Sequence, residues 1–184
     1  MKAFWICLSL LLSVAPATAI QLSDGESAFN GPLRLLRAAV TQNTVENFPV
    51  YYQFAIEAPA KLDEPLARID IALPTEAGPY FGLYLPNPNQ VRAFIPTDPY
   101  AQKPQEAART LPIEATVNQS LISVRFLEPV APGSVVTVEW GPVRNPSLDG
   151  NYLFSLTAFP PGPAPRGMYI GIGRIVIRSG GKDG

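Results

Sequence analysis

Residues 50–57 read Val-Tyr-Tyr-Gln-Phe-Ala-Ile-Glu, and the apolar residues Val50, Tyr52, Phe54 and Ile56 fall on every second position. A period of two places alternate side chains on opposite faces of a β-strand. The same alternation recurs in four later segments, which are 68–73, 113–118, 121–126 and 135–140. One apolar and one polar face per strand is typical of an antiparallel sheet.

The two segments on either side of residues 118–119 are predicted to form a hairpin. The expected register pairs Ala115 with Ile122 and Ile113 with Val124. All four apolar side chains then lie on one face. A change of register by one residue would move the apolar side chains of one strand to the opposite face.

Further strands are predicted at 152–159 and 168–178. The apolar phase of the last segment changes between Ile172 and Ile175. A β-bulge inserts one extra residue and shifts the phase in this way, so Gly173 is expected to hold a bulge.

Two parts of the chain are less regular. Residues 33–41 fit either a first strand or a short helical turn. Residues 74–112 contain eight prolines, which exclude a helix or a central strand, and only 91–95 has a strand pattern there.

Short strands separated by turn residues, without a helical segment, predict an all-β fold: an immunoglobulin-like antiparallel β-sandwich with a long Pro-rich loop segment. Gly150-x-Tyr152-x-Phe154 supports the immunoglobulin-like form, because a similar motif makes the tyrosine corner of those sandwiches. An ordinary strand after a glycine turn explains the motif equally well. The expected division is a single domain over 20–178 and a polar tail over 179–184.

The N-terminus has the three parts of a secretory signal peptide. Lys2 precedes an uncharged apolar run over 3–14, and small residues follow at 15–19. The run is shorter than the roughly 20 residues that span a bilayer. Cleavage between Ala19 and Ile20 is therefore expected, with an uncleaved anchor as the alternative. The cleaved protein is expected to be exported to the periplasm or the extracellular space, and not to be an integral membrane protein.

Cleavage of 19 residues from the 184 leaves 165 residues and removes the single cysteine. The exported chain thus has no disulfide to stabilise it in an oxidising compartment. A domain of this size buries roughly 70% of its unfolded surface, which is enough for a hydrophobic core to hold it together.

The composition excludes several functions. The chain has no histidine, so it lacks a Ser-His-Asp triad and imidazole metal ligands. A net charge of −1 and an isoelectric point near 5.5 argue against nucleic-acid binding. No cofactor and no metal are expected.

Several segments, in this order, resemble the family known as domain of unknown function 2808. They are Phe48–Pro59, Glu64–Ile71, Val130–Val138, Val143–Pro146, Tyr152–Pro160 and Tyr169–Arg174. The resemblance covers roughly residues 33–178 and implies an exported, mainly cyanobacterial protein without an assigned activity or catalytic residues.

A more distant likeness is to periplasmic copper-carrier sandwiches, through Pro132, Gly133 and Trp140. Copper carriage needs His, Met or Cys ligands, and after cleavage only Met168 remains.

The expected function is that of a non-catalytic cell-envelope or secreted module with a binding or structural role. An envelope protein or a glycan is the expected partner class, and the oligomeric state stays open. Aromatic residues of the Pro-rich loop are the candidate binding residues, because aromatics on a loop over a rigid sandwich present a contact surface. They are Tyr80, Phe81, Tyr84 and Tyr100. The alternative is that these rings cap the core.

A carboxylate-only hydrolase of the glycosidase type is the alternative function, since two convergent carboxylates suffice for that chemistry. The carboxylates on strand segments are more simply explained as solvated groups on polar faces; examples are Glu57, Asp70, Glu114 and Glu139. The outward sheet faces are expected to carry only dispersed charges, such as Arg68, Asp70, Glu114 and Arg125.

Overall fold

The structure, a computed structural model, describes residues 25–72, 83–100, 106–118 and 120–180. The predicted signal peptide, with its cleavage position between Ala19 and Ile20, lies outside the described residues. Within them, no helix is both long enough and apolar enough to cross a membrane.

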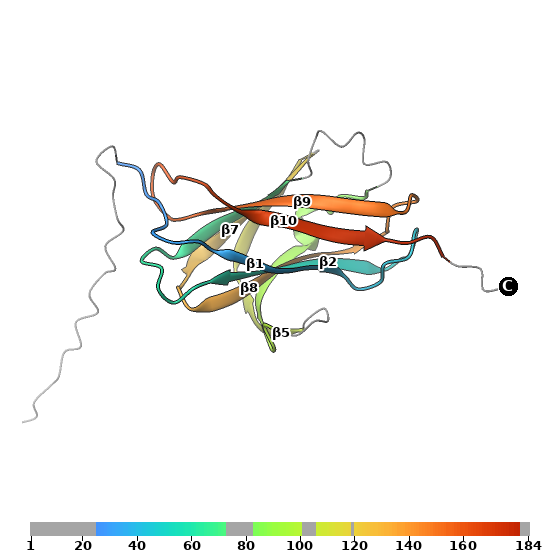
Figure 1. Cartoon of the computed structure of the whole chain (residues 1–184), viewed down its shortest axis with the longest axis horizontal. Helices are drawn as coiled ribbons and strands as arrows, with labels where there is room; N and C mark the ends of the chain where they lie inside the picture. Colours follow the sequence, from blue (N-terminus) through green and yellow to red (C-terminus); the bar gives the residue numbers. More distant parts are fainter. Residues whose placement is uncertain (1–24, 73–82, 101–105, 119, 181–184) are drawn as a thin grey trace, which may run out of the picture.

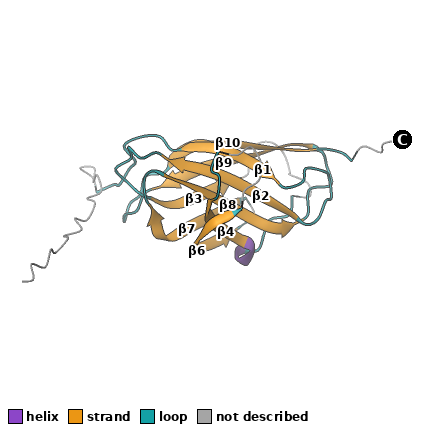
Figure 2. Cartoon of the chain, turned by 90° about the horizontal axis from the view of Figure 1, so that it is seen from below, coloured by secondary structure: helices purple, strands orange, loops and turns teal. Residues whose placement is uncertain are grey.

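Two five-stranded antiparallel sheets pack face to face (Figures 1 and 2). The first has the order β1-β2-β8-β4-β5 and the second β10-β9-β3-β7-β6. The strands are β1 (Arg34–Val40), β2 (Val50–Ala58), β3 (Leu66–Ala72), β4 (Val91–Pro96), β5 (Ala107–Leu111), β6 (Ile113–Val117), β7 (Leu121–Val130), β8 (Ser134–Val143), β9 (Gly150–Phe159) and β10 (Met168–Ile177), with a short 3-10 helix, η2 (Pro88–Gln90). The predicted all-β antiparallel sandwich is confirmed.

The core lies between the sheets and is centred on aromatic rings that the period-two pattern placed on inward faces. Trp140 of β8 stacks on Phe54 at 5.0 Å and on Tyr52 at 5.5 Å between ring centroids. Phe154 of β9 meets Trp140 edge-on from the opposite sheet at 5.8 Å. Aromatic pairs in these geometries add to the free energy gained by burial.

The tyrosine of the Gly150-x-Tyr152 motif makes the contact expected of a tyrosine corner. Its hydroxyl donates to the carbonyl oxygen of Leu148, four residues upstream, at 2.9 Å. The structure establishes two antiparallel sheets and the strand order in each. The more specific immunoglobulin-like form stays a prediction.

The structure decides or corrects several predictions about individual strands. Residues 34–40 form the strand β1 rather than a helical turn. The 74–112 segment holds a second strand, β5, which the sequence pattern missed. Four of its five residues are exposed, so it lacks the apolar alternation by which an edge strand is recognised.

The predicted hairpin register is wrong by two residues. Ala115 pairs with Val124 and Val117 pairs with Ile122, and the turn closes between Asn118 and Leu121. Because side chains alternate with a period of two, this shift leaves the same apolar residues on the same face.

The predicted bulge is displaced as well. The register of β10 with β9 shifts between Tyr169 and Gly171, and Gly171 has φ +135°. Gly173 has another role: a Cβ there would lie 2.8 Å from both the Ala38 Cβ and a ring carbon of Phe54. Gly173 thus allows β10 to approach β1.

The edge strands β1 and β10 lie side by side, and short backbone bridges join their flanking segments at both ends (Figure 1). Ser27 bridges Pro165 and Thr44 bridges Arg178, both in parallel orientation. This β1–β10 seam closes one side of the sandwich.

Candidate functional site

A hollow of about 320 Å³ lies at the end of the sandwich where β2 begins and β8 ends. We call it the end hollow. It is lined by Phe48, Tyr84, Gln90, Pro142, Val143 and Arg144.

The two aromatic rings of the end hollow are unusually accessible. Phe48 is 56% exposed and Tyr84 is 54% exposed. The Arg144 guanidinium lies 5.8 Å from the centre of the Phe48 ring, within the range of a cation–π contact. The hollow therefore offers aromatic faces and one cation to a ligand.

The buried side chain of Asn145 fixes the wall that carries Phe48. Its Nδ2 donates to the carbonyl oxygens of Gln42 and Thr44, both at 2.7 Å. Its backbone N–H donates to the Asn47 carbonyl at 3.0 Å. These bonds tie the β1–β2 loop to the β8–β9 loop, so the wall is rigid before any ligand arrives.

The opposite wall is fixed by η2. Gln90 donates from Nε2 to the Pro142 carbonyl at 2.8 Å, and its Oε1 accepts from the Asn87 N–H at 2.8 Å. The first bond anchors η2 to the end of β8. Each polar end of the Gln90 amide therefore makes one hydrogen bond within the protein.

The structure separates the aromatic residues that the sequence grouped as one binding loop. Tyr84 lines the end hollow, whereas Tyr80 and Phe81 lie outside the described residues. Tyr100 is 64% exposed and donates from its hydroxyl to Glu57 Oε1 at 3.2 Å. The charge of Glu57 and this hydrogen bond raise the pKa of Tyr100. Neither Tyr84 nor Tyr100 is a buried cap of the core.

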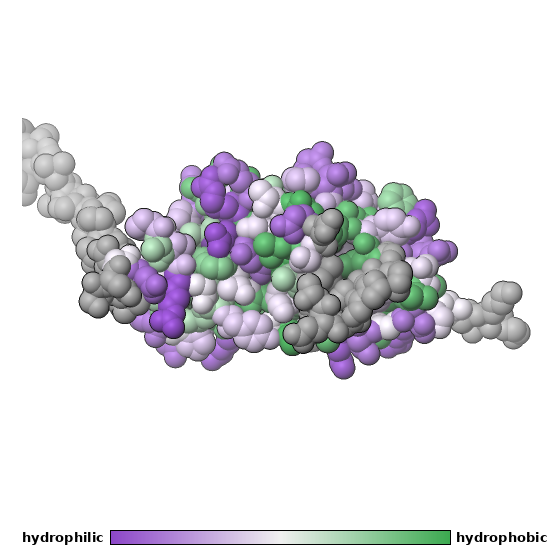
Figure 3. Space-filling view, turned by 90° about the horizontal axis from the view of Figure 1, so that it is seen from above, coloured by the Kyte–Doolittle hydropathy of each residue, from purple (hydrophilic) through white to green (hydrophobic). Residues whose placement is uncertain are grey.

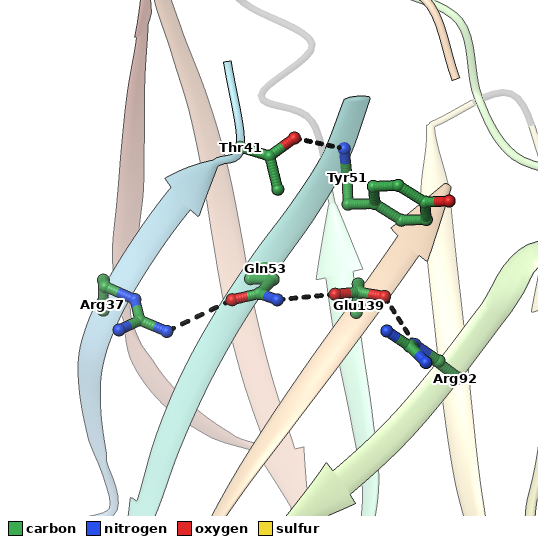
Figure 4. A network of polar contacts seen from close by, with 6 residues as sticks. All are labelled: Arg37, Thr41, Tyr51, Gln53, Arg92 and Glu139. Atoms are coloured by element: carbon green, nitrogen blue, oxygen red, sulfur yellow. Dashed lines mark hydrogen bonds and ion pairs between the residues drawn. The ribbon is translucent and has the colours of Figure 1, made fainter. Parts of the chain in front are cut away.

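The prediction that Glu139 is a solvated carboxylate is wrong, because Glu139 is buried on the outer side of the first sheet. Gln53 donates to its Oε2 at 2.6 Å, and Arg92 donates to its Oε1 (Figure 4). Arg37 donates in turn to Gln53 Oε1 at 3.3 Å. This polar ladder crosses four neighbouring strands and uses both oxygens of Glu139 to hold them together.

The charges on the second sheet are paired rather than dispersed. Arg68 Nε lies 3.2 Å from Asp70 Oδ1, and Arg125 contacts Glu114. In the space-filling view from above, hydrophobic and hydrophilic residues are interspersed on the part of this face that grey atoms leave visible (Figure 3). The part of the chain that the structure describes holds no cluster of three or more His, Cys, Asp or Glu residues arranged for a metal ion.

Sequence reasoning found Tyr84 but missed the other lining residues of the end hollow. Phe48, Gln90 and Arg144 come from three separate connections, which meet only because β2, β8 and β4 are neighbours in one sheet. No local pattern in the sequence predicts that these three connections lie together.

Comparison with known proteins gives a family and structural neighbours. A family model described as "Protein of unknown function (DUF2808)" matches residues 26–177. No curated protein matches the sequence. A solved structure described as "Crystal structure of BslA - A bacterial hydrophobin" is similar at 10% identity and a TM-score of 0.49, with 83% of this chain and 98% of that chain covered.

Proposed function

The chain belongs to the DUF2808 family of proteins of unknown function, and we propose that it is an exported, non-catalytic binding module that holds a protein partner in the end hollow. One observation carries the proposal: two half-exposed aromatic rings, Phe48 and Tyr84, face one hollow whose walls are fixed by internal hydrogen bonds. Pre-organised aromatic surfaces lose little entropy on binding and are typical of interface hot spots.

The chemistry of the end hollow favours a protein side chain over a glycan. A sugar presents many hydroxyl groups, which need free donors and acceptors. Half of the lining residues are the apolar Phe48, Pro142 and Val143, and the Gln90 amide already makes one hydrogen bond at each end, to Pro142 and from Asn87. An apolar or aromatic side chain of an envelope protein therefore matches the hollow better than a sugar ring does.

Two features support a non-catalytic role. Glycosidase chemistry needs two carboxylates that face a substrate. Glu139 is instead buried, with both of its oxygens bonded to protein donors. None of the described residues that line the end hollow carries a carboxylate.

The test combines the changes Phe48→Ala and Tyr84→Ala in one variant. Wild type and variant are immobilised, incubated with envelope extract, and compared for the proteins retained. The expected result is loss of at least one retained protein with little change in melting temperature, because both rings are half exposed. Tyr169→Ala is the matched control, since Tyr169 is an equally exposed aromatic on β10.

Unchanged retention by the double variant would overturn the proposal. Retention that polysaccharide competes away, and that protease treatment of the extract does not affect, would show a glycan partner instead. A large fall in melting temperature would show that the rings support the core, which also contradicts the proposal.

A further inference from the structure

A second cavity, of about 310 Å³, lies at the opposite end of the sandwich, where β3 begins and β7 and β9 end. We call it the arginine cavity. Its wall includes Arg68, Arg125, Leu127, Phe159, Pro161 and Pro165.

The two arginines face each other directly across the β3–β7 pair, since Arg68 is the register partner of Arg125. Like charges placed directly opposite in a sheet destabilise it. No carboxylate belongs to the described lining of this cavity. Each arginine has a carboxylate partner outside the cavity, so the repulsion is already offset in part, but the two charged groups of the cavity wall itself are both cations and would attract an anion.

The acidic partners of these arginines leave most of the guanidinium donors free. Asp70 and Glu114 do not line the cavity. The Arg68 Nε is buried and lacks a hydrogen-bond partner among the described residues, although Asp70 lies at ion-pair distance. Arg125 uses Nη2 for Glu114. An arginine has five N–H donors, so both retain donors for a ligand.

The rest of the wall is apolar and orients Arg68. The Arg68 guanidinium lies 3.7 Å from the centre of the Phe159 ring, a close cation–π contact. This contact holds the guanidinium against the Phe159 ring, and proline residues of the 160–165 segment line the same cavity. A ligand would meet a flat cation and an apolar surface together.

Ser27 holds the proline segment in place. Its hydroxyl donates to the Pro161 carbonyl at 2.6 Å, and its backbone bonds to Ala164 and Arg166. A Cβ at Gly162 would lie 2.4 Å from the Ser27 Oγ, so this close approach requires a glycine. The cavity wall is therefore pre-formed.

We propose that the arginine cavity binds a carboxylate carried on a small apolar or aromatic body. Its volume lies at the lower end of the range for small-molecule sites, about 300–1,000 Å³. Guanidinium groups bind carboxylates through paired, charge-assisted hydrogen bonds, and the proline and Phe159 surfaces accept the apolar part of the ligand. The ligand is either a free small acid or the C-terminal carboxylate of a polypeptide.

The test titrates the whole exported chain with 3-phenylpropionate and with its neutral amide, 3-phenylpropanamide, by calorimetry. We expect saturable binding of the acid with at least about tenfold preference over the amide, since hydrogen bonds to charged groups contribute about 1.5–3 kcal/mol. Arg68→Met and Arg125→Met should each weaken acid binding by about 10- to 100-fold. Arg174→Met, an exposed arginine of β10 outside the cavity, should leave it unchanged.

A second arm uses a short peptide that ends in phenylalanine, with a free or an amidated C-terminus. Tighter binding of the free-carboxylate peptide than of 3-phenylpropionate identifies a polypeptide C-terminus, and weaker binding identifies a small acid. Equal binding of acid and amide, no saturable binding of any carboxylate, or an equal effect of Arg174→Met would overturn the proposal. Arg125 is half exposed, so Arg125→Met keeps the test valid if Arg68→Met impairs folding.

Discussion

The hydroxyl of Tyr52 donates a 2.8 Å hydrogen bond to Oδ1 of Asn145, and both side chains are buried. Tyr52 belongs to the central aromatic cluster, and Asn145 clamps the loops beside the end hollow. The hydrogen bond thus connects the core of the sandwich to the wall of the proposed binding site.

Asn145→Ala should lower the free energy of unfolding by about 3 kcal/mol. The change leaves the buried Tyr52 hydroxyl without its partner, at a cost of about 1–3 kcal/mol, and removes two part-buried hydrogen bonds to the Gln42 and Thr44 carbonyls, which contribute about 0.5–1.5 kcal/mol each. Urea unfolding followed by tryptophan fluorescence measures the loss. Asn151→Ala, at an exposed position of β9, is the control, and a loss below about 1 kcal/mol for Asn145→Ala would refute the clamp.

Stability should fall steeply above pH 10. Burial, followed by the nearby Tyr152, raises the pKa of Tyr52 well above its ordinary value of 10.0. The unfolded chain therefore releases the Tyr52 proton near pH 10, while the folded chain retains it. The contribution of Tyr52 to the free energy of unfolding is complete below pH 10 and is lost as the pH rises above it. The slope is about 1.4 kcal/mol per pH unit for each such tyrosine.

Urea unfolding at pH 9, 10 and 11 measures this slope. Tyr52→Phe should make it shallower, although the variant is less stable at neutral pH because it loses the bond to Asn145. Equal stability of the wild type at pH 9 and pH 11 would contradict the expectation.

Gly173→Ala should destabilise the protein by about 1–3 kcal/mol, the usual cost of overpacking a core. The new methyl group would lie 2.8 Å from the Ala38 Cβ and from the Phe54 ring, so β10 must move away from β1. The melting temperature of this variant is compared with that of Gly31→Ala, whose new Cβ would contact only Leu62, at 3.4 Å. Equal melting temperatures of the two variants would show that the seam is not tightly packed.

Tyr152→Phe should lower the free energy of unfolding by about 1 kcal/mol, since it removes one hydrogen bond to the Leu148 carbonyl and keeps the ring in the core. Tyr169→Phe, on the exposed side of β10, should have no effect. Equilibrium unfolding of both variants decides whether the tyrosine corner stabilises this end of β9.

Export should leave a protein that begins at Ile20. Mass spectrometry of the mature protein is expected to show loss of residues 1–19, because the small residues before Ile20 fit a signal-peptidase site. Intact Met1 in a membrane fraction would instead indicate the uncleaved anchor.

The sequence predicts the sandwich well because its strands alternate apolar residues on the inward face with other residues on the outward face. In β7 and β9 burial alternates along most of the strand, whereas the outward residues Gln53 and Ala55 of β2 are buried as well. The pattern does not determine which residues pair, as the two-residue error in the β6–β7 register shows. It also misses β5, an exposed edge strand without an apolar face.

The sequence predicts the candidate site less well, because the burial of a polar side chain depends on residues that are near it in space but distant in sequence. Glu139 follows the polar phase of β8, yet Gln53 and Arg92 bury it by bonding to both of its oxygens. Phe48 lies beside Tyr84 in the end hollow, in the loop before β2 that is bonded to Asn145. These contacts arise between segments far apart along the chain.

The β1–β10 seam has a mechanical consequence. The first and last strands of the domain run parallel, so a force that pulls its two ends apart acts along the seam as shear. The bridges at Ser27 and Arg178 lie at opposite ends of the seam and each contains two backbone hydrogen bonds. Under shear these bonds carry the load together instead of opening one after another, and the close approach at Gly173 resists sliding. A force applied through both termini would therefore load these four backbone hydrogen bonds in shear.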